Sequence, residues 1–212
     1  MGVPLRNRVT PMGELIAVAE RGLVYGNRGC LHDARGEIRR SWAVKRWIAC
    51  RLQFRGWRRT PLMQPGRFTE LFFLDEATAF AAGHRPCALC RRADYDRFTG
   101  VWAQLHPGAR GADAVDAVLH GERVVAGGGR VLHETGADGL PDGVFVLRDG
   151  AVWVVVGPEL ARWTPGGYVD RVSRPVGEPA VVLTPRSLVA VLASGWEPVV
   201  PLLHPSAAGA RR

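Results

Sequence analysis

Residues 72–90 read FFLDEATAFAAGHRPCALC, and this stretch limits most strongly what fold the chain can adopt. Its aromatic and aliphatic beginning predicts a strand, Asp75 is a good N-cap for a short alanine-rich helix, and Gly83 is a good helix stop. Cys87 and Cys90 then follow at the spacing with which two thiolates bind one metal ion. The stretch therefore predicts zinc as the cofactor.

The two-cysteine motif also has two other interpretations. A redox-active pair belongs between a strand and the start of a helix, whereas this motif follows a helix. The cysteines could also remain unligated. Pro86, directly before Cys87, fixes the turn that directs both sulfurs inward and so favours the metal.

The composition is that of an ordinary globular protein. Of the 212 residues 47% are hydrophobic and only four are cysteine. Apolar runs such as residues 151–156 are too short to cross a bilayer, and residues 1–6 hold no apolar signal region. We therefore expect a cytoplasmic protein without membrane association, whose cysteines bind metal or stay free rather than form disulfides.

Positive charge is concentrated in the first half of the chain. Residues 1–110 contain 19 arginine and lysine side chains against 9 acidic ones, and residues 111–212 contain 9 against 11, for a net charge of +8. Lys45 is the single lysine, a bias that a GC-rich gene also produces. Since the excess charge lies in one half and guanidinium groups bind phosphate well, we expect a nucleic-acid partner, DNA rather than RNA.

Glycine-rich and proline-containing segments at residues 106–112 and 126–130 indicate a boundary near residue 110. We predict an α+β fold in two lobes: a basic, zinc-binding lobe over residues 1–110 and a small, strand-rich α+β lobe over residues 111–212. The second lobe contains no recognisable catalytic signature.

Hydrophobic periodicity and turn residues predict the elements of both lobes. The first lobe is expected to have strands at residues 23–25, 47–50 and 69–74, a helix or strand at residues 14–18, and helices at residues 76–82 and 93–105. The second is expected to have a hairpin over residues 143–156 that turns at Asp149 and Gly150, a strand at residues 179–183, and helices at residues 113–119 and 185–194.

Residues 51–66 are predicted to form an exposed basic loop. The candidate nucleic-acid-binding residues in and beside it are Arg51, Arg55, Trp57, Arg58, Arg59 and Arg67. The arginines would neutralise phosphates, and Trp57 would stack on a base. The alternative is a solvated arginine face with Trp57 packed on the core. Residues 26–29 have the composition of a phosphate nest but lack the P-loop pattern, so we interpret them as a turn.

Over residues 47–94 the chain resembles the metal-binding domain of the Ada methylphosphotriester-repair family. The resemblance is carried by Phe72 and Phe73, by the helix that starts at Glu76, and by AGHRPCALCR at residues 82–91. It implies a zinc site whose first cysteine pair is spaced Cys-x-x-x-Cys, with one cysteine accepting a methyl group. Cys50 matches the first position of that pair, but Phe54 stands where the second cysteine is expected.

We therefore predict a zinc site formed by Cys30, Cys50, Cys87 and Cys90, because four sulfurs form the closed tetrahedron of a structural zinc. His32 is the alternative to Cys30 as fourth ligand, and otherwise a histidine in an exposed loop. His84 is interpreted as a surface or packing group.

Three functions follow from these interpretations. The first is a nucleic-acid-associated protein with a structural zinc. The second, implied by the resemblance, is a methyl acceptor with Cys50 as nucleophile, which requires a zinc-activated thiolate within reach of a phosphotriester. The third is a protein whose activity lies in residues 111–212 and whose zinc only stabilises the fold.

Overall fold

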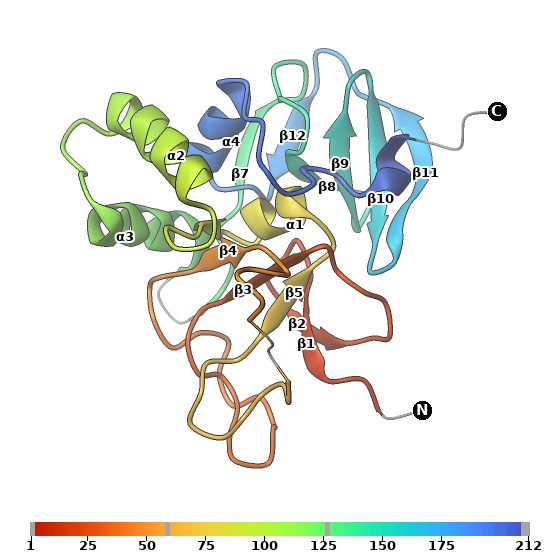
Figure 1. Cartoon of the computed structure of the whole chain (residues 1–212). Coiled ribbons are helices and arrows are strands. Elements are labelled where there is room, and N and C mark those ends of the chain that lie inside the picture. The colour runs from red at the N-terminus through yellow and green to blue at the C-terminus, as the bar shows by residue number, and fades with distance from the viewer. Residues whose placement is uncertain (1–2, 58–59, 126–127, 209–212) are drawn as a thin grey trace.

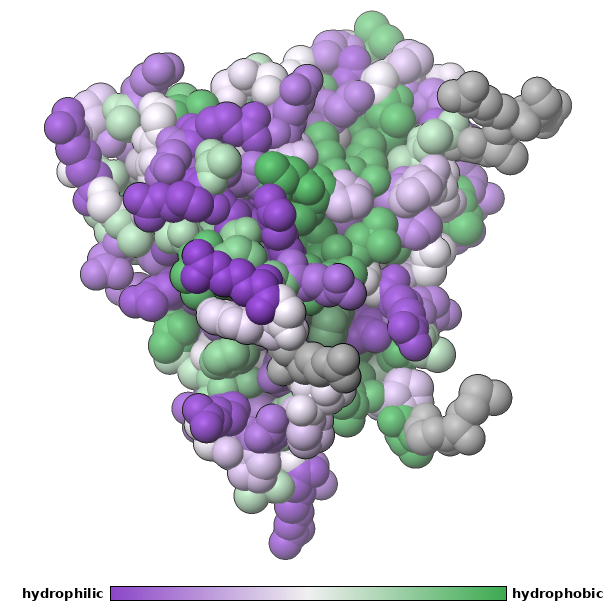
Figure 2. All heavy atoms as spheres, viewed as in Figure 1, coloured by the Kyte–Doolittle hydropathy of each residue, from purple (hydrophilic) through white to green (hydrophobic). Residues whose placement is uncertain are grey.

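The computed structural model describes residues 3–57, 60–125 and 128–208 (Figure 1). Within them the chain forms two six-stranded sheets and four α-helices, which confirms the predicted α+β class. Hydrophilic side chains are spread over much of the face in Figure 2, with hydrophobic ones between them. None of the described helices is long and apolar enough to cross a membrane.

The first sheet is formed by the N-terminal part of the chain. In the order in which they pair, its strands are β2 (Leu15–Ala17), β1 (Arg6–Val9), β5 (Leu71–Phe73), β3 (Val24–Asn27), β4 (Ile48–Cys50) and β6 (Arg85–Pro86). The pairs β1–β5 and β4–β6 are parallel, and the other neighbours are antiparallel. The strands predicted at residues 23–25, 47–50 and 69–74 are confirmed as β3, β4 and β5, and residues 14–18 contain β2.

Helix α1 (Glu76–Ala81) lies between the two sheets, and all six of its residues are buried (Figure 1). The Asp75 side chain accepts a hydrogen bond from the Thr78 amide, which confirms the predicted N-cap. Gly83 follows the helix with a φ of +85°, in the left-handed region where glycine is favoured. The stop predicted from the sequence is therefore present.

The second sheet is antiparallel throughout. In the order in which they pair, its strands are β11 (Gly167–Ser173), β10 (Glu159–Thr164), β9 (Ala151–Val156), β8 (Phe145–Arg148), β12 (Pro179–Val182) and β7 (His133–Gly136). Asp149 and Gly150 both have positive φ, at 51° and 72°, as a two-residue hairpin turn between β8 and β9 requires. The predicted hairpin and the strand at residues 179–183 are confirmed.

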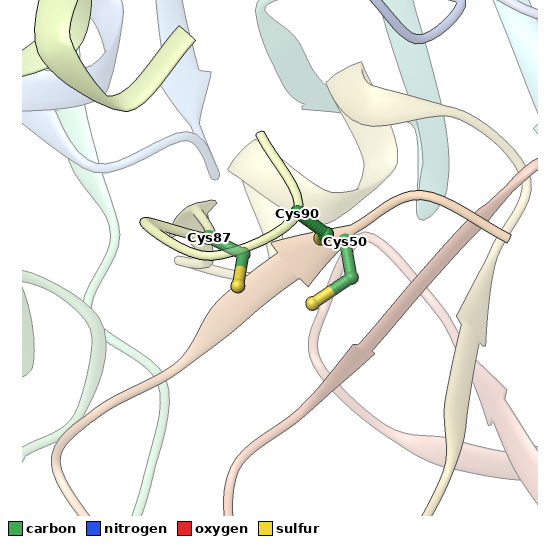
Figure 3. A group of neighbouring side chains, drawn as sticks. All are labelled: Cys50, Cys87 and Cys90. Carbon is green, nitrogen blue, oxygen red and sulfur yellow. The ribbon is translucent and has the colours of Figure 1, made fainter. Parts of the chain in front are cut away.

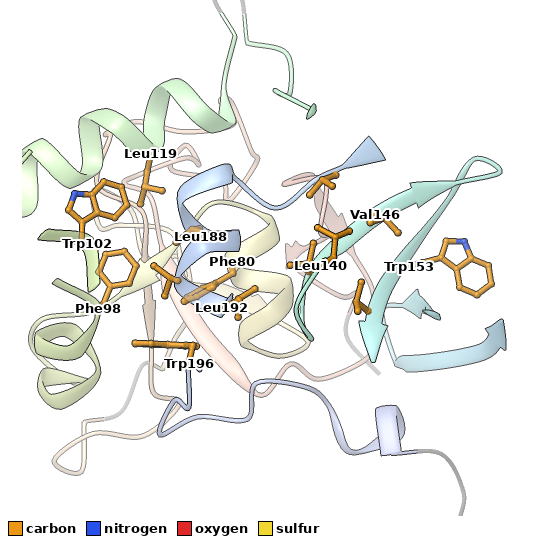
Figure 4. Close-up of a cluster of buried hydrophobic side chains, with 14 of the residues drawn as sticks. Phe80, Phe98, Trp102, Leu119, Leu140, Val146, Trp153, Leu188, Leu192 and Trp196 are labelled. Atoms are coloured by element: carbon orange, nitrogen blue, oxygen red, sulfur yellow. The ribbon is translucent and has the colours of Figure 1, made fainter. Parts of the chain in front are cut away.

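Three further helices flank α1: α2 (Arg92–Leu105), α3 (Ala112–Arg123) and α4 (Arg186–Ala193); η1 (Pro205–Ala208) is a short 3-10 helix. Their apolar faces meet in the largest core cluster, in which Phe80 of α1 packs with Phe98 and Trp102 of α2, Leu119 of α3 and Leu188 of α4 (Figure 4). Helix α3 extends beyond the predicted residues 113–119.

Contacts across residue 110 are extensive. Phe80 belongs to the same core cluster as strand residues of the second sheet, and the α1 amides of Glu76 and Ala77 donate to the carbonyls of Pro201 and Leu202 at 3.0 and 2.9 Å. The boundary predicted near residue 110 falls in the connection between α2 and α3. The division into two lobes stays a prediction.

Candidate metal centre

Strand β4 and the turn after β6 bring three cysteines together (Figure 3). Cys50 is the last residue of β4, and the parallel pairing with β6 sets Ala49 opposite Pro86. The Cys87 amide donates to the Ala49 carbonyl at 2.9 Å, which holds Cys87 beside the end of β4. Cys90 returns to the same place before α2 begins.

The sulfurs of these residues have the spacing of a metal site. The Sγ atoms of Cys50, Cys87 and Cys90 all lie within 4.8 Å of one another. Zinc–sulfur bonds of about 2.3 Å in a tetrahedral site put the sulfurs about 3.8 Å apart, so small side-chain rotations would let all three contact one ion. Their exposures are only 5%, 7% and 7%, and all three are free thiols. This donor set fits a soft divalent cation such as zinc.

The three thiols change one another's ionisation. Hydrogen bonds from Cys50 and Cys90, with help from the Cys90 and Leu89 amides, lower the pKa of Cys87 to about 2. Hydrogen bonding to Cys87 and Cys90, together with burial, raises the pKa of Cys50 well above its ordinary value. Hydrogen bonding thus favours the thiolate at Cys87 and the neutral thiol at Cys50. A bound cation would allow all three thiols to ionise, because ligation deprotonates them.

Aromatic side chains surround the cysteines. Tyr25 is buried with them, and Phe54 and Phe72 pack against them. Tyr25 stands opposite Cys50 in the β3–β4 pairing, and its ring meets that of Phe72 edge to face at 5.8 Å between centroids. These apolar neighbours strengthen the attraction between thiolates and a cation by excluding water. Tyr25 could not be assigned to the site from the sequence, because only the strand register places it opposite a cysteine.

A buried ion network fixes the segment that carries Cys90. Arg91, the next residue, bridges Glu76 of α1 at 2.5 Å and Asp94 of α2 at 2.6 Å, and all three side chains are fully buried. Asp94 also accepts from Arg97 at 2.9 Å, and the Trp196 indole donates to Glu76 at 3.3 Å. The cysteine turn is therefore anchored to the centre of the molecule independently of any metal.

The structure does not bring Cys30 or His32 into this group. Cys30 is half-buried, and its thiol donates to the His32 carbonyl at 3.5 Å. The His32 ring bonds the Thr69 hydroxyl at 2.6 Å and the Gln64 carbonyl at 3.2 Å. Both ring nitrogens are therefore engaged elsewhere. At 6% exposure His32 is also not the exposed loop histidine that we expected, because these two partners draw its ring inward.

His84 is a packing group, one of the two alternatives predicted for it. Its ring is fully buried, 5.1 Å from that of Trp47 and 4.6 Å from that of Phe73. Burial, with the charges of nearby arginines, lowers its pKa well below the ordinary histidine value.

The predicted basic loop lies next to the metal centre. Its described arginines, Arg51, Arg55 and Arg67, are exposed, and Trp57 is 54% exposed rather than packed on the core. Trp57 contacts Phe54 edge to face at 5.6 Å, and Phe54 in turn packs against the cysteines. Arg58 and Arg59 lie outside the described residues. An exposed aromatic and cationic surface thus adjoins the cluster.

Comparisons of this chain with protein-family models, with curated proteins and with solved structures found no match. The function is therefore inferred from the geometry of the site. It supports a metal-binding cluster of three cysteines.

Proposed function

We propose that the protein binds one zinc ion through Cys50, Cys87 and Cys90, and that the ion ties β4 to the turn before α2. The convergence of three buried free thiols from two chain segments within 4.8 Å is the observation that supports this most. Thiolates favour zinc, whereas magnesium and calcium take oxygen ligands. A ligand from outside this group occupies the fourth coordination position of the ion, as water does in zinc sites with three protein ligands.

Metal analysis of the purified protein tests this proposal. We expect one zinc per chain, lost in Cys50→Ser, Cys87→Ser and Cys90→Ser and retained in Cys30→Ser, the matched control. Removing the zinc with a chelator should lower the thermal midpoint, because an ion that binds only the folded chain stabilises it by about 4 kcal/mol at a thousandfold excess over its Kd. Loss of zinc in Cys30→Ser would favour the four-cysteine set instead, and absence of zinc binding would refute the proposal.

We further propose that the surface beside the zinc contacts nucleic acid, DNA in the first place. What supports this is the position of exposed Arg51, Arg55 and Trp57 beside the cysteines, since Arg51 follows Cys50 and the other two contact Phe54. Arg67 is a further exposed arginine of the same connection between β4 and β5. Arginines neutralise backbone phosphates, and an exposed indole provides a stacking platform.

Binding of a single-stranded DNA at several salt concentrations tests this second part. The double variant Arg55→Glu/Arg67→Glu should bind more weakly and with a smaller salt slope, since each lost phosphate contact removes about 0.7 from the slope for a single strand. The control, Arg110→Glu/Arg186→Glu, reverses two exposed arginines on the helical side of the molecule and should bind like the unchanged protein. Equal effects of both pairs would indicate only a general charge effect.

An Ada-like methyl acceptor with Cys50 as nucleophile is the second candidate. The observation that favours it is that the cluster contains three thiols, since zinc sites with three protein ligands keep a position open for a reactant. The low exposure of Cys50, 5%, counts against attack on a bulky phosphotriester. Intact mass of the zinc-loaded protein after incubation with methylated DNA tests it: a gain of one methyl that Cys50→Ser abolishes is expected, and an unchanged mass would rule it out.

A further inference from the structure

A second feature of the molecule is a group of buried arginines around a small cavity. The cavity has a volume of about 60 Å³ and is lined by residues of several segments, among them Arg28, Ser41, Trp47, Arg123 and Arg130. None of the described arginines of the basic loop lines it. It is a separate site from the cysteine cluster.

Two of these guanidinium groups are almost completely buried. Arg28 and Arg123 each have 1% exposure, and Arg130 is partly buried. Burial and the charge of Arg130 lower the pKa of Arg28 to about 9. Burial also lowers the pKa of Arg123 to about 9, with the neighbouring arginines adding to the shift and Asp116 opposing it. Burial also lowers the pKa of Arg130 to about 10. The environment therefore disfavours their positive charges.

None of these three arginines forms an ion pair with a carboxylate within the part of the chain that the structure describes, although the charge of Asp116 partly offsets that of Arg123. Arg28 donates to the Gly13 carbonyl at 2.8 Å, Arg123 to the Gly83 carbonyl at 2.6 Å and also to that of Lys45, and Arg130 to the Leu183 carbonyl at 2.7 Å and also to that of Ala81. The nearby carboxylate of Asp116 is engaged by Arg85 through two hydrogen bonds of 2.9 and 2.7 Å. The hydrogen bonds of the three arginines thus go to neutral carbonyl oxygens.

Each of the three arginines also has a buried Nε atom with no hydrogen-bond partner among the described residues. A buried donor without a partner is costly, and an uncompensated buried charge more so. These N–H groups are therefore available to a ligand that accepts hydrogen bonds.

The surrounding structure holds the guanidinium groups in fixed positions. Trp47 contacts two of them, with its ring centroid 4.6 Å from the guanidinium carbon of Arg28 and 4.0 Å from that of Arg123. Gly83 leaves room for Arg123, since a Cβ there would stand 2.5 Å from the Arg123 Cδ. This is a pre-formed cationic site, whose ligand does not have to organise the side chains on binding.

The cavity has the size for a small oxyanion. One water needs about 10–15 Å³, so a cavity of about 60 Å³ has room for several atoms of that size. Arginine is the side chain best suited to phosphate, because its planar donors match two oxygens at once. We propose that this cavity binds a phosphate group, either inorganic phosphate or the terminal phosphate of a larger molecule. The proposal goes beyond the zinc and nucleic-acid functions and does not depend on them.

Calorimetric titration of the zinc-loaded protein with inorganic phosphate tests this site. Saturable binding and a higher thermal midpoint are expected, with no such effect from sodium chloride at equal ionic strength. Arg28→Met and Arg130→Gln should each weaken phosphate binding by about tenfold or more, whereas Arg35→Gln, which changes an exposed loop arginine, should leave it unchanged. If Arg28→Met does not fold, as judged by circular dichroism, Arg130→Gln carries the comparison because its side chain is less buried.

Two oligonucleotides that differ only in a 5′-phosphate distinguish the sources of the ligand. Tighter binding of the phosphorylated one, reversed by inorganic phosphate, would identify a terminal phosphate; equal binding of both, with inorganic phosphate still bound, would identify the free anion. No binding of inorganic phosphate at millimolar concentration, or equal binding by Arg130→Gln, would overturn the proposal.

Discussion

The Tyr168 hydroxyl donates a hydrogen bond of 2.6 Å to the Asp75 carboxylate, across 93 residues of sequence. The same carboxylate caps α1 through the Thr78 amide and accepts from the His204 amide at 2.8 Å. Burial raises the pKa of Asp75, although these donors oppose the shift. One side chain thus joins the central helix, strand β11 and the C-terminal segment.

Replacing Tyr168 by Phe should therefore destabilise the protein. The change removes one donor from a fully buried carboxylate, which costs about 1–3 kcal/mol in free energy of unfolding. Urea denaturation at neutral pH measures this loss in free energy of unfolding. Tyr95→Phe is the control, because the Tyr95 hydroxyl has no hydrogen-bond partner in the described part of the chain, and its denaturation midpoint should not change.

Phe54→Cys should strengthen zinc binding. Phe54 packs against the three cysteines at the position where the Ada-like pattern has a second cysteine, so a thiol there would supply the fourth sulfur of a closed site. We expect affinity to rise by about 10-fold or more, given that even outer-shell partners of ligands change it by about 10–100-fold. Competition with a chromogenic chelator measures this. Phe54→Ala removes the ring without adding a ligand; equal affinity of both variants would show that the ring, not the fourth thiolate, limits binding.

Trp57→Ala should separate nucleic-acid binding from stability. Because Trp57 is 54% exposed, its loss should change the free energy of unfolding by no more than about 0.5 kcal/mol. A lost base-stacking contact should weaken single-stranded DNA binding by about 1–3 kcal/mol. Leu105→Ala, an exposed apolar residue of α2, is the control in a fluorescence-anisotropy titration. Normal DNA binding by Trp57→Ala would contradict a stacking role for Trp57.

Acid stability should depend on Asp94. Burial opposes its ionisation, but Arg91, Arg97 and the Val199 amide outweigh burial and lower the pKa of Asp94. The unfolded chain therefore takes up this proton first, so the contribution of Asp94 is complete above about pH 4 and is lost as the pH falls through the lower folded-state value.

Asp94→Asn should accordingly be less stable at neutral pH by about 3–5 kcal/mol, the cost of breaking a buried ion pair. Its stability should also fall less steeply in acid. Asp96→Asn, an exposed residue of the same helix, is the matched control for denaturation curves at several pH values. Parallel curves for Asp94→Asn and the unchanged protein below about pH 4 would contradict the assignment.

Local features of the fold followed from the sequence. Asp75 and Gly83 marked both ends of α1, and Asp149 with Gly150 marked the β8–β9 turn, because each feature depends on residues adjacent in sequence. Strands β1, β6, β7, β10 and β11 were not predicted. The first two have only four and two residues, too few to show a pattern. The residues of the other three are largely exposed or mixed in polarity, so neither alternation nor a buried run distinguishes them.

The candidate site was predictable only in part. Cys87 and Cys90 form a local motif, and Cys50 was matched through the family pattern, but the choice of Cys30 rested on counting sulfurs. Which cysteines lie close in space depends on the pairing of β4 with β6. The spacing of the cysteines along the chain does not reveal that pairing. The buried Arg28 and Arg123 were missed for a related reason: charged side chains are expected on the surface, and only the fold shows otherwise.

The burial of α1 on all sides also limits where the chain tolerates truncation, insertion or fusion. Its six residues contact the first sheet, the second sheet and the other helices. A polypeptide ending near residue 110 would expose the side of this helix that packs with the second sheet and α4. Insertions or fusions are therefore best accommodated in the exposed loops, away from this helix.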